Sequence, residues 1–288
     1  MPTTLSPLSL HPPSPTHAPG LASRLELIEA AAWADLFQSA NAADVRALDL
    51  SVGLVGSTVM MAAAETDVLA LNRAVGLGAH MPVAAPELDA VMAFFADAGS
   101  PRYFIQVSPT AEPTTLHDEL LDRGFRHHNN WVKLVRSIRA LPHVRTDLKV
   151  ERLASDRADI FASALPTAFD WPEAMAGPFA RTVGRSSWHH YAVYDGDEPV
   201  AVAAMFVVGD TAYLGPAVTQ PDHRGRGAQS ALIARRLHDA AAFGATLAVT
   251  ETAEERPERP VVQSYRNMRR LGFEIAYVRP NYLYERIA

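Results

Sequence analysis

Ala217-Val218-Thr219-Gln220-Pro221-Asp222-His223-Arg224-Gly225-Arg226-Gly227-Ala228-Gln229-Ser230 joins a strand-like run to a helix through a turn that contains two glycines. The apolar, partly β-branched run from Leu214 to Val218 indicates a strand, which Pro221 ends. After Ala228, apolar residues recur at helical spacing, at Leu232, Ile233, Leu237, Ala240 and Ala241. Gly244 follows as a C-terminal cap would. The stretch therefore predicts a strand, a turn and a helix in succession.

The turn has the features of an anion-binding loop. Gly225 and Gly227 allow the backbone to turn with its N–H groups pointing inward. The unpaired N–H groups and positive dipole end of the following helix, together with Arg224 and Arg226, suit a phosphate or pyrophosphate. A basic surface turn is the alternative interpretation of these four residues alone. Their position between a strand and a helix favours the anion site.

This turn resembles the acyl-coenzyme A (acyl-CoA) loop of the GNAT N-acetyltransferase superfamily, whose pattern is Gln/Arg-x-x-Gly-x-Gly/Ala. The corresponding residues are Arg224-Gly225-Arg226-Gly227-Ala228-Gln229, and Gln229 departs from the usual Gly or Ala. The resemblance implies that these six residues bind acetyl-CoA or another acyl-CoA as a co-substrate.

A second block, Ser264 to Phe273, looks like the GNAT segment that packs beside the pantetheine and adenosine ends of the cofactor. Ser264 and Asn267 lie three residues apart, hence on one helix face, where their side chains can hydrogen-bond the pantetheine amides. A helix N-terminal serine and a surface asparagine are the alternative interpretation. Beside the anion loop we expect the cofactor role.

The resemblance also implies that the strand from Tyr213 to Val218 diverges from the next strand. Its backbone N–H groups would then be available to pantetheine and to the oxyanion that develops during acyl transfer. We expect Ala217 and Val218 to act through their backbone.

Glu251 follows the strand Leu247–Thr250 and is the expected general base, because a protonated amine must lose a proton before it attacks. A solvated strand-end carboxylate is the alternative. Many GNAT enzymes protonate the leaving thiolate with a tyrosine four residues before the Gly-Phe pair, where this chain has Met268. Tyr265 is the substitute hypothesis, against the alternative of a buried structural tyrosine.

The order of predicted elements indicates an α/β (α+β layered) protein of two tandem GNAT-like domains, each a mixed, mostly antiparallel sheet flanked by helices. A helix is expected over 21–48, strands over 57–64 and 68–75, and two final strands over 274–279 and 282–287. Leu120-Leu121-Asp122-Arg123-Gly124-Phe125 recurs in part as Met268-Arg269-Arg270-Leu271-Gly272-Phe273. We predict a disordered tail over 1–20, a degenerate GNAT-like domain over 21–140 and an acyl-CoA-binding domain over 141–288.

Composition excludes several classes of function. The net charge of −6 argues against nucleic acid as a partner, and the absence of cysteine excludes a cysteine acyl-enzyme and thiolate metal sites. No metal-binding motif is found, so we expect no metal. The N-terminus lacks a signal-peptide pattern and no apolar run spans a bilayer, so we expect a cytoplasmic protein without membrane partners.

We therefore expect direct transfer of an acetyl or other acyl group from coenzyme A to an amine of a small molecule or a peptide. The alternative is a non-catalytic acyl-CoA binding or sensing protein. The sequence does not specify the acceptor or the oligomeric state.

Overall fold

A computed structural model describes residues 20–255 and 263–286 of the chain. It forms two compact units, of which unit 1 comprises Met1–Trp131 and Tyr277–Ala288, and unit 2 comprises Val132–Ala276. The compact units divide after Trp131 and after Ala276. The domain boundary predicted after residue 140 stays a prediction. The tail predicted over 1–20 lies outside the described residues except for Gly20.

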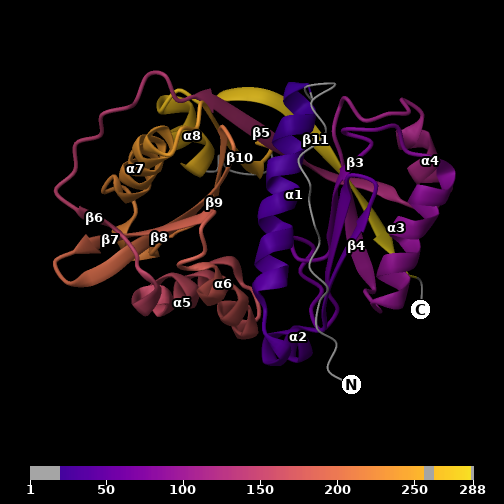
Figure 1. Cartoon of the computed structure of the whole chain (residues 1–288), viewed down its shortest axis with the longest axis horizontal. Coiled ribbons are helices and arrows are strands. Elements are labelled where there is room, and N and C mark those ends of the chain that lie inside the picture. Colours follow the sequence, from indigo (N-terminus) through magenta and orange to yellow (C-terminus); the bar gives the residue numbers. More distant parts are fainter. Residues whose placement is uncertain (1–19, 256–262, 287–288) are drawn as a thin grey trace. The chain divides into compact units, whose positions relative to one another are not determined.

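Unit 1 is a sheet with helices on both faces. Its helices are α1 (Leu21–Ser39), α2 (Ala42–Leu48), α3 (Ala85–Asp97) and α4 (Leu116–Asp122). Its strands are β1 (Leu50–Val55), β2 (Thr58–Ala63), β3 (Arg73–Leu77) and β4 (Arg102–Val107), joined by parts of β5 (Arg126–Ser137) and β11 (Glu274–Glu285). The order is β1-β2-β3-β4-β11, antiparallel except for β3 and β4. Helix α1 covers one face, and α3 and α4 cover the other (Figure 1).

Four predicted elements were wrong in their extent. The helix predicted over 21–48 is two helices, because the Asn41 side chain accepts hydrogen bonds from the N–H groups of Ala43 and Asp44 and starts α2. Strand β3 begins at Arg73 and not at residue 68, because the Asn72 side chain bonds backbone groups of the preceding turn. The two predicted C-terminal strands form the single strand β11.

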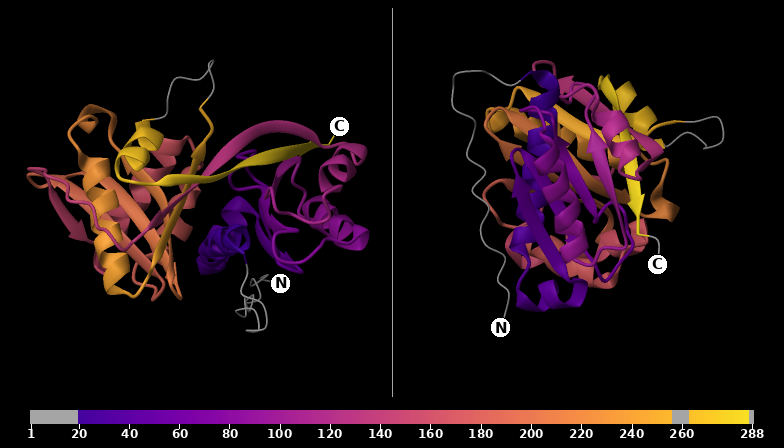
Figure 2. Two further views of the ribbon diagram at one scale, coloured as in Figure 1. Left: turned by 90° about the horizontal axis from the view of Figure 1, so that it is seen from above. Right: turned by 90° about the vertical axis from the view of Figure 1, so that its right-hand side faces the viewer.

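Unit 2 is also a sheet with helices on both faces. Its strands are β6 (Lys149–Arg152), β7 (Trp188–Asp195), β8 (Glu198–Val208), β9 (Thr211–Thr219) and β10 (Leu247–Ala253). Its helices are α5 (Ala158–Phe169), α6 (Ala176–Thr182), α7 (Ala228–Ala242) and α8 (Gln263–Arg270). The order is β10-β9-β8-β7-β6, with residues 132–137 of β5 beside β10. Helices α7 and α8 lie on one face and α5 and α6 on the other (Figure 2).

The predicted fold class is confirmed, since the strands, which form one 11-stranded sheet, are mixed, mostly antiparallel and flanked by helices in each unit. The predicted helix after the glycine turn starts at Ala228, and Gly244 follows it with a positive φ of 88°. Separate hydrophobic cores fill the two units.

The segments 21–137 and 158–285 repeat one order of main elements, α-α-β-β-β-α-β-α-β. Pairing repeats as well, because β1-β2-β3 and β7-β8-β9 are antiparallel runs that each end in a parallel pair, with β4 and β10 respectively. The last strand of each segment leaves its own sheet. Strand β11 pairs with β4 of unit 1, and β5 lies beside β10 of unit 2.

A buried arginine supports the irregular pairing of β8 with β9. The register shifts between Ala203 and Met205, opposite Pro216, which has no N–H to donate. The guanidinium of Arg236 on α7 donates instead to the carbonyl of Ala204 at 2.8 Å. Burial lowers the pKa of Arg236 to about 10, so this side chain stays charged at neutral pH.

Arg236→Met is expected to lower the free energy of unfolding of unit 2 by about 2–3 kcal/mol, because it leaves the buried Ala204 carbonyl without a donor. Chemical denaturation followed by circular dichroism measures the change. Arg235→Met is the matched control, since Arg235 is the neighbour on the same helix and forms a partly exposed pair with Asp239. The control is expected to change stability by about 0.5 kcal/mol. Equal effects of the two substitutions would contradict the role given to Arg236.

Candidate functional site

Strands β9 and β10 diverge in unit 2. They are parallel neighbours over three pairs, the last being Tyr213 with Val249, although β9 continues to Thr219 and β10 to Ala253. At the point of divergence the Thr250 hydroxyl donates to the carbonyl of Leu214 at 2.8 Å. Beyond it, one edge of β9 carries backbone groups that β10 does not pair in this register, as the resemblance had implied.

The divergence leaves a gap between β9 and β10. The register of β9 with β8 determines which N–H groups of β9 face this gap. The Gln220 N–H donates to the carbonyl of Val200 on β8 at 2.9 Å. Hydrogen-bonded pairs recur every two residues in an antiparallel ladder, so the N–H of Val218 also faces β8. The N–H groups of Ala217 and Thr219 therefore face the gap. This geometry favours Ala217 and Thr219, and not Val218, as backbone donors.

The glycine turn leads directly into α7. Gly225 and Gly227 have φ of 81° and 86°, a left-handed backbone that favours glycine, and a Cβ at either position would meet open space. Gly227 is the N-cap of α7 and provides no side-chain hydrogen bond to the first turn. The N–H groups at the start of this helix are thus available to an anion.

A pocket of about 710 Å³ opens at this helix start. Strand β9 and the turn contribute the predicted residues Ala217, Val218, Arg224, Gly225 and Gly227. The starts of α7 and α8 contribute the predicted residues Ala228, Gln229, Ser264 and Asn267. The pocket is also lined by Arg145, Phe169, His223 and Arg270.

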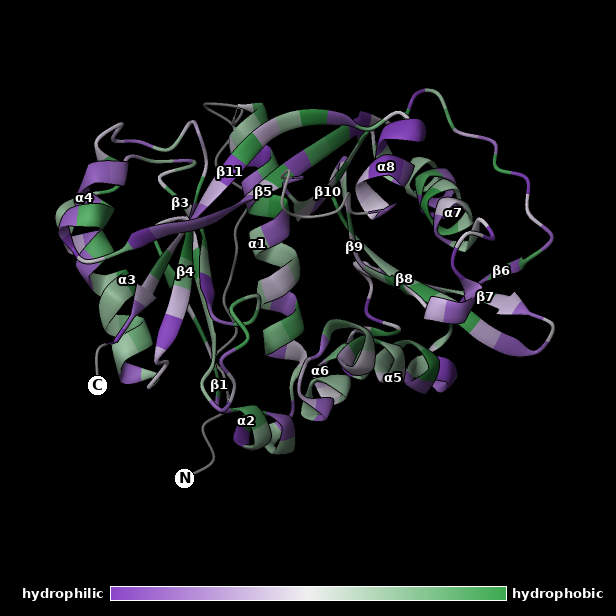
Figure 3. Cartoon of the chain, turned by 180° about the vertical axis from the view of Figure 1, so that it is seen from behind, coloured by the Kyte–Doolittle hydropathy of each residue, from purple (hydrophilic) through white to green (hydrophobic). Residues whose placement is uncertain are grey.

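The lining of this pocket is cationic in a chain of net charge −6. Arg145, Arg224 and Arg270 line it, and its described lining residues include no aspartate or glutamate. Helix α8 appears in hydrophilic colours in Figure 3, in keeping with its arginines. Positive side chains and a helix N-terminus that meet in one pocket suit a phosphorylated ligand.

Gln229 and Asn267 connect the two helix starts. The Asn267 amide nitrogen donates to Oε1 of Gln229 at 2.6 Å, and its oxygen accepts from Gln263 at 3.1 Å and from Arg270. These bonds occupy the Asn267 side chain within the protein. The departure at Gln229 therefore has a structural reason, since a glycine or alanine there would remove the bond between α7 and α8.

Arg226 is the one predicted cofactor residue that does not line the pocket. Its guanidinium pairs with the Asp195 carboxylate in the β7–β8 turn and lowers the pKa of that carboxyl. We interpret Arg226 as a residue that ties the glycine turn to this hairpin.

Glu251 lies in a buried polar network across three neighbouring strands. Lys133 Nζ on β5 is 3.1 Å from Oε2 of Glu251, and the Tyr213 hydroxyl on β9 donates to Oε1 at 3.3 Å. The Lys133 side chain is 1% exposed and the Glu251 side chain 11%. Both oxygens of the carboxylate thus accept a hydrogen bond, and a small part of the side chain stays exposed. It does not line the pocket described above.

Tyr265 and Met268 lie on the core side of α8. Met268 is 8% exposed within the core of unit 2, and the half-buried Tyr265 packs against the same core. Neither lines the pocket, and Tyr265 makes no described hydrogen bond to Glu251. This position favours the structural interpretation of Tyr265.

Comparisons with known proteins agree with this geometry. Residues 152–272 match the model of the acetyltransferase (GNAT) family. The match lies within unit 2 and includes the glycine turn, α7 and α8. A search of curated proteins finds no match.

Solved structures resemble the chain over almost its whole length. A GCN5-related N-acetyltransferase from Kribbella flavida has a TM-score of 0.61 and 21% identity, covering 94% of this chain and 98% of its own. A GCN5-related N-acetyltransferase from Sphaerobacter thermophilus has a TM-score of 0.58 and 16% identity, and the match covers 95% of this chain and 94% of its own. A tandem GNAT protein from the clavulanic acid biosynthesis pathway has a TM-score of 0.58 and 15% identity, and the match covers 91% of this chain and 94% of its own. At these identities the likeness shows the fold.

Unit 1 has a counterpart of the Glu251 network with different chemistry. In the parallel pair β3–β4, Arg73 lies opposite Phe104, and Gln106 follows Phe104 by two residues. In the parallel pair β9–β10, Tyr213 lies opposite Val249, and Glu251 follows Val249 by two residues. Gln106 therefore occupies the position in unit 1 that Glu251 occupies in unit 2. Arg73 donates to Gln106 at 2.8 Å, and Gln106 donates to Asn281 on β11 at 2.8 Å. A glutamine amide does not act as a general base. At this position of the strand, unit 2 has the carboxylate of Glu251 and unit 1 has the amide of Gln106.

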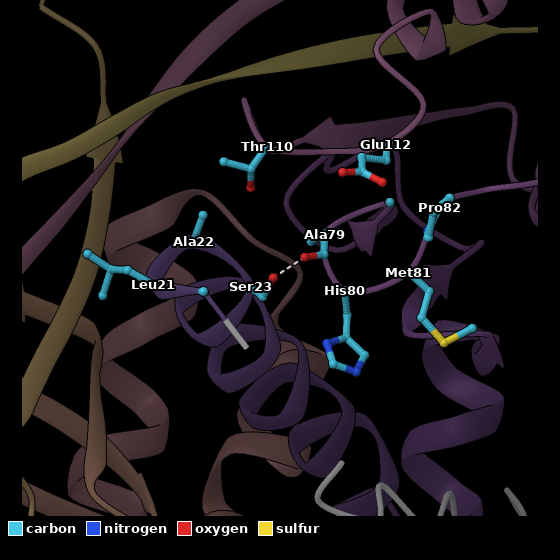
Figure 4. A pocket seen from close by; sticks show the side chains of 11 residues that line it. Leu21, Ala22, Ser23, Ala79, His80, Met81, Pro82, Thr110 and Glu112 are labelled. Carbon is cyan, nitrogen blue, oxygen red and sulfur yellow. Dashed lines mark hydrogen bonds between the residues drawn. The ribbon is translucent and has the colours of Figure 1, made fainter. Parts of the chain in front are cut away.

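In unit 1, backbone hydrogen bonds close the region after β3 that corresponds to the gap between β9 and β10 in unit 2. The Glu112 N–H donates to the carbonyl of Gly78 at 3.0 Å, and the Glu112 carbonyl accepts from Val83 at 2.8 Å. The small pocket beside it, about 260 Å³, is lined by Glu112 and His80 and by no arginine or lysine (Figure 4). Ser23 of α1 donates to the Ala79 carbonyl there. This pocket lacks the positive charge that a pyrophosphate needs.

Adjacent histidines point to opposite faces of their strand, as alternation predicts. His189 stacks on Phe243 after α7, with ring centroids 4.2 Å apart, and His190 lies 3.0 Å from the Thr182 hydroxyl on α6. Burial lowers the pKa of His189 to about 4 and that of His190 to about 3, so both are neutral at physiological pH. Within residues 20–255 and 263–286, no three histidine, aspartate or glutamate side chains form a group that could hold a metal ion.

The search for membrane spans gives a negative result. In the part of the chain that the structure describes, no helix combines the length and the apolar character that crossing a bilayer requires.

Sequence reasoning missed several residues of the site, among them Lys133, Arg145, Phe169, Tyr213 and Thr219. Lys133 precedes the predicted domain boundary, and Arg145 lies in the connection between β5 and β6, where no motif marks it. A lysine in an otherwise apolar strand run, Trp131-Val132-Lys133-Leu134-Val135, was the one available signal, because such a charge needs a buried partner.

Proposed function

We propose that unit 2, which contains the match to the GNAT family, binds acetyl-CoA or another acyl-CoA at the α7 pocket and transfers the acyl group directly to an amine of a small molecule or a peptide. The observation that carries this proposal is the uncapped N-terminus of α7, with its glycine turn, opening into a pocket lined by three arginines. The pyrophosphate is assigned to the turn and the N–H groups of Ala228 and Gln229. Arg145, Arg224 and Arg270 are assigned to its phosphate charges.

The gap between β9 and β10 is assigned to the pantetheine arm and the thioester. The N–H groups of Ala217 and Thr219 face it, and Ser264 lies at the pocket wall. A donor aimed at the thioester oxygen stabilises the charge that develops as the amine attacks, typically by a few kcal/mol. Asn267 and Gln229 hold the two helix starts in place around the ligand.

Glu251 is assigned the role of general base. The amine nitrogen forms a C–N bond with the thioester carbon, Glu251 takes a proton that this nitrogen loses, and the C–S bond breaks as the thiolate leaves. The chain has no cysteine, so transfer is direct and passes through no cysteine acyl-enzyme. The thiolate needs no strong acid, because the pKa of a thiol is near 8.5.

A non-catalytic acyl-CoA-binding protein is the second candidate. The buried Met268 favours it, since no proton donor stands where the resemblance places a tyrosine. We further propose that the segment 21–137 is a degenerate copy of the same fold, as its repeated element order, Gln106 and closed gap support.

Calorimetric titration with acetyl-CoA and with dephospho-coenzyme A, followed by thiol release with a panel of amines, tests the proposal. Acetyl-CoA is expected to bind in the micromolar range and thiol to be released with at least one amine. Binding without thiol release from any amine would select the second candidate. Absence of binding would overturn both.

A further inference from the structure

Lys133 is an unusual residue in this chain. The sequence contains two lysines, Lys133 and Lys149, and uses arginine for its other long basic side chains. Lys149 lies on β6 with its side chain 70% exposed, 2.6 Å from Glu151. Lys133 is buried and lies 3.1 Å from Glu251. A buried ammonium is costly unless a partner compensates it, so the position of Lys133 depends on Glu251.

The network fixes the carboxylate from both sides. Lys133 holds Oε2 from β5, and Tyr213 holds Oε1 from β9, so that each oxygen of Glu251 has a donor on a different neighbouring strand. Lys133 and Tyr213 therefore contact Glu251 from the strands on either side of β10.

We infer that Lys133 is a positioning residue for acyl transfer, which orients the Glu251 carboxylate. This inference rests on the proposed function, in which Glu251 is the base. The acceptor ammonium loses two protons on its way to the amide: Glu251 takes one of them, and the other goes to the departing thiolate or to solvent. Lys133 and Tyr213 keep theirs, so the network returns to its starting state when Glu251 releases the proton to solvent.

A double-mutant cycle tests whether Lys133 acts through Glu251. Lys133→Met is expected to lower kcat about tenfold or more and to leave the KM for acetyl-CoA within about twofold. In the Glu251→Gln background, Lys133→Met is expected to cause no further loss of kcat, because the group that it positions is gone. Lys133→Arg is expected to recover at least about a third of the parent kcat. Lys149→Met, which removes the same charge at the surface, is the matched control and is expected to change nothing.

The kcat of the folded fraction separates positioning from a structural role. A merely structural residue would lower the amount of folded enzyme and leave the kcat of the folded fraction at the parent value. Thermal unfolding of each variant identifies any that do not fold, and Lys133→Gln then replaces Lys133→Met in the cycle.

Lysine labelled with ¹³C at Cε gives a readout that does not depend on activity, because the chain contains two lysines. The Lys133 signal is expected to shift in Glu251→Gln while the Lys149 signal stays in place. An unchanged Lys133 signal overturns the inference whatever the activity of the protein. A parent that transfers acyl groups and keeps its kcat in Lys133→Met overturns the inference and leaves the proposed function standing. A parent without acyl transfer overturns the proposed function and, with it, the catalytic part of the inference.

Discussion

Glu251→Gln is expected to lower the kcat of acyl transfer by about 100-fold or more, the usual contribution of a general base. The substitution keeps the shape of the side chain and can still accept a hydrogen bond from Lys133, but the amide cannot take a proton from the amine. The affinity for acetyl-CoA is expected to stay within about threefold, since Glu251 does not line the α7 pocket. Steady-state thiol release and calorimetric titration measure the two effects separately.

Tyr265→Phe is the control for this prediction. Tyr265 packs against the core of unit 2 and keeps its ring in the variant, so kcat is expected to change by less than about threefold. Full activity in Glu251→Gln would contradict the assignment of the base. A larger loss in Tyr265→Phe than in Glu251→Gln would move the proton chemistry to α8.

Gly227→Val is expected to weaken acetyl-CoA binding by about 100-fold or more. The backbone at Gly227 has a φ of 86°, which a β-branched residue rarely adopts, and the added side chain stands in the open space where the anion is placed. Calorimetry with acetyl-CoA measures the loss, and circular dichroism shows whether the variant folds.

The chain offers a matched control at the other end of the same helix. Gly244 follows α7 with a φ of 88°, and a Cβ there also meets open space, but Gly244 does not line the pocket. Gly244→Val therefore introduces similar backbone strain and is expected to leave the affinity within about twofold. Equal losses of affinity in the two variants would show that strain, and not the occupied space, causes the effect.

Local features of the site were predictable because the sequence encodes them within a few residues. Two glycines in the turn from Arg224 to Gln229 indicate its conformation, and the spacing of apolar residues after the turn predicts α7. Nine of the ten predicted cofactor residues line one pocket, and Arg226 is the exception because its partner Asp195 lies 31 residues away. The assignment of acyl-CoA to that pocket stays a prediction.

Contacts between distant strands were not predictable from one sequence. Lys133 and Glu251 are separated by 118 residues, and no local pattern says which strand will lie beside β10. Similarly, the choice between the N–H groups of Val218 and Thr219 depends on the register with β8, which shifts near Ala204. A shift of one residue exchanges the two edges of a strand, so spacing in the sequence does not decide this question.

The exchanged strands β5 and β11 have a consequence for the history and engineering of the protein. Strand β5 ends the first repeated segment but supplies Lys133 to the network around Glu251, and β11 ends the second segment but supplies Asn281 to β4. A gene cut at the predicted boundary after residue 140 would give two fragments, each carrying a strand that the other requires. Such fragments are expected to be insoluble alone and to recover acyl-CoA binding when co-expressed. A recombinant that replaces one half with that of another tandem protein must therefore preserve the pairing of β5 beside β10 and of β11 with β4. For this reason we expect the two halves to be exchanged together and not separately.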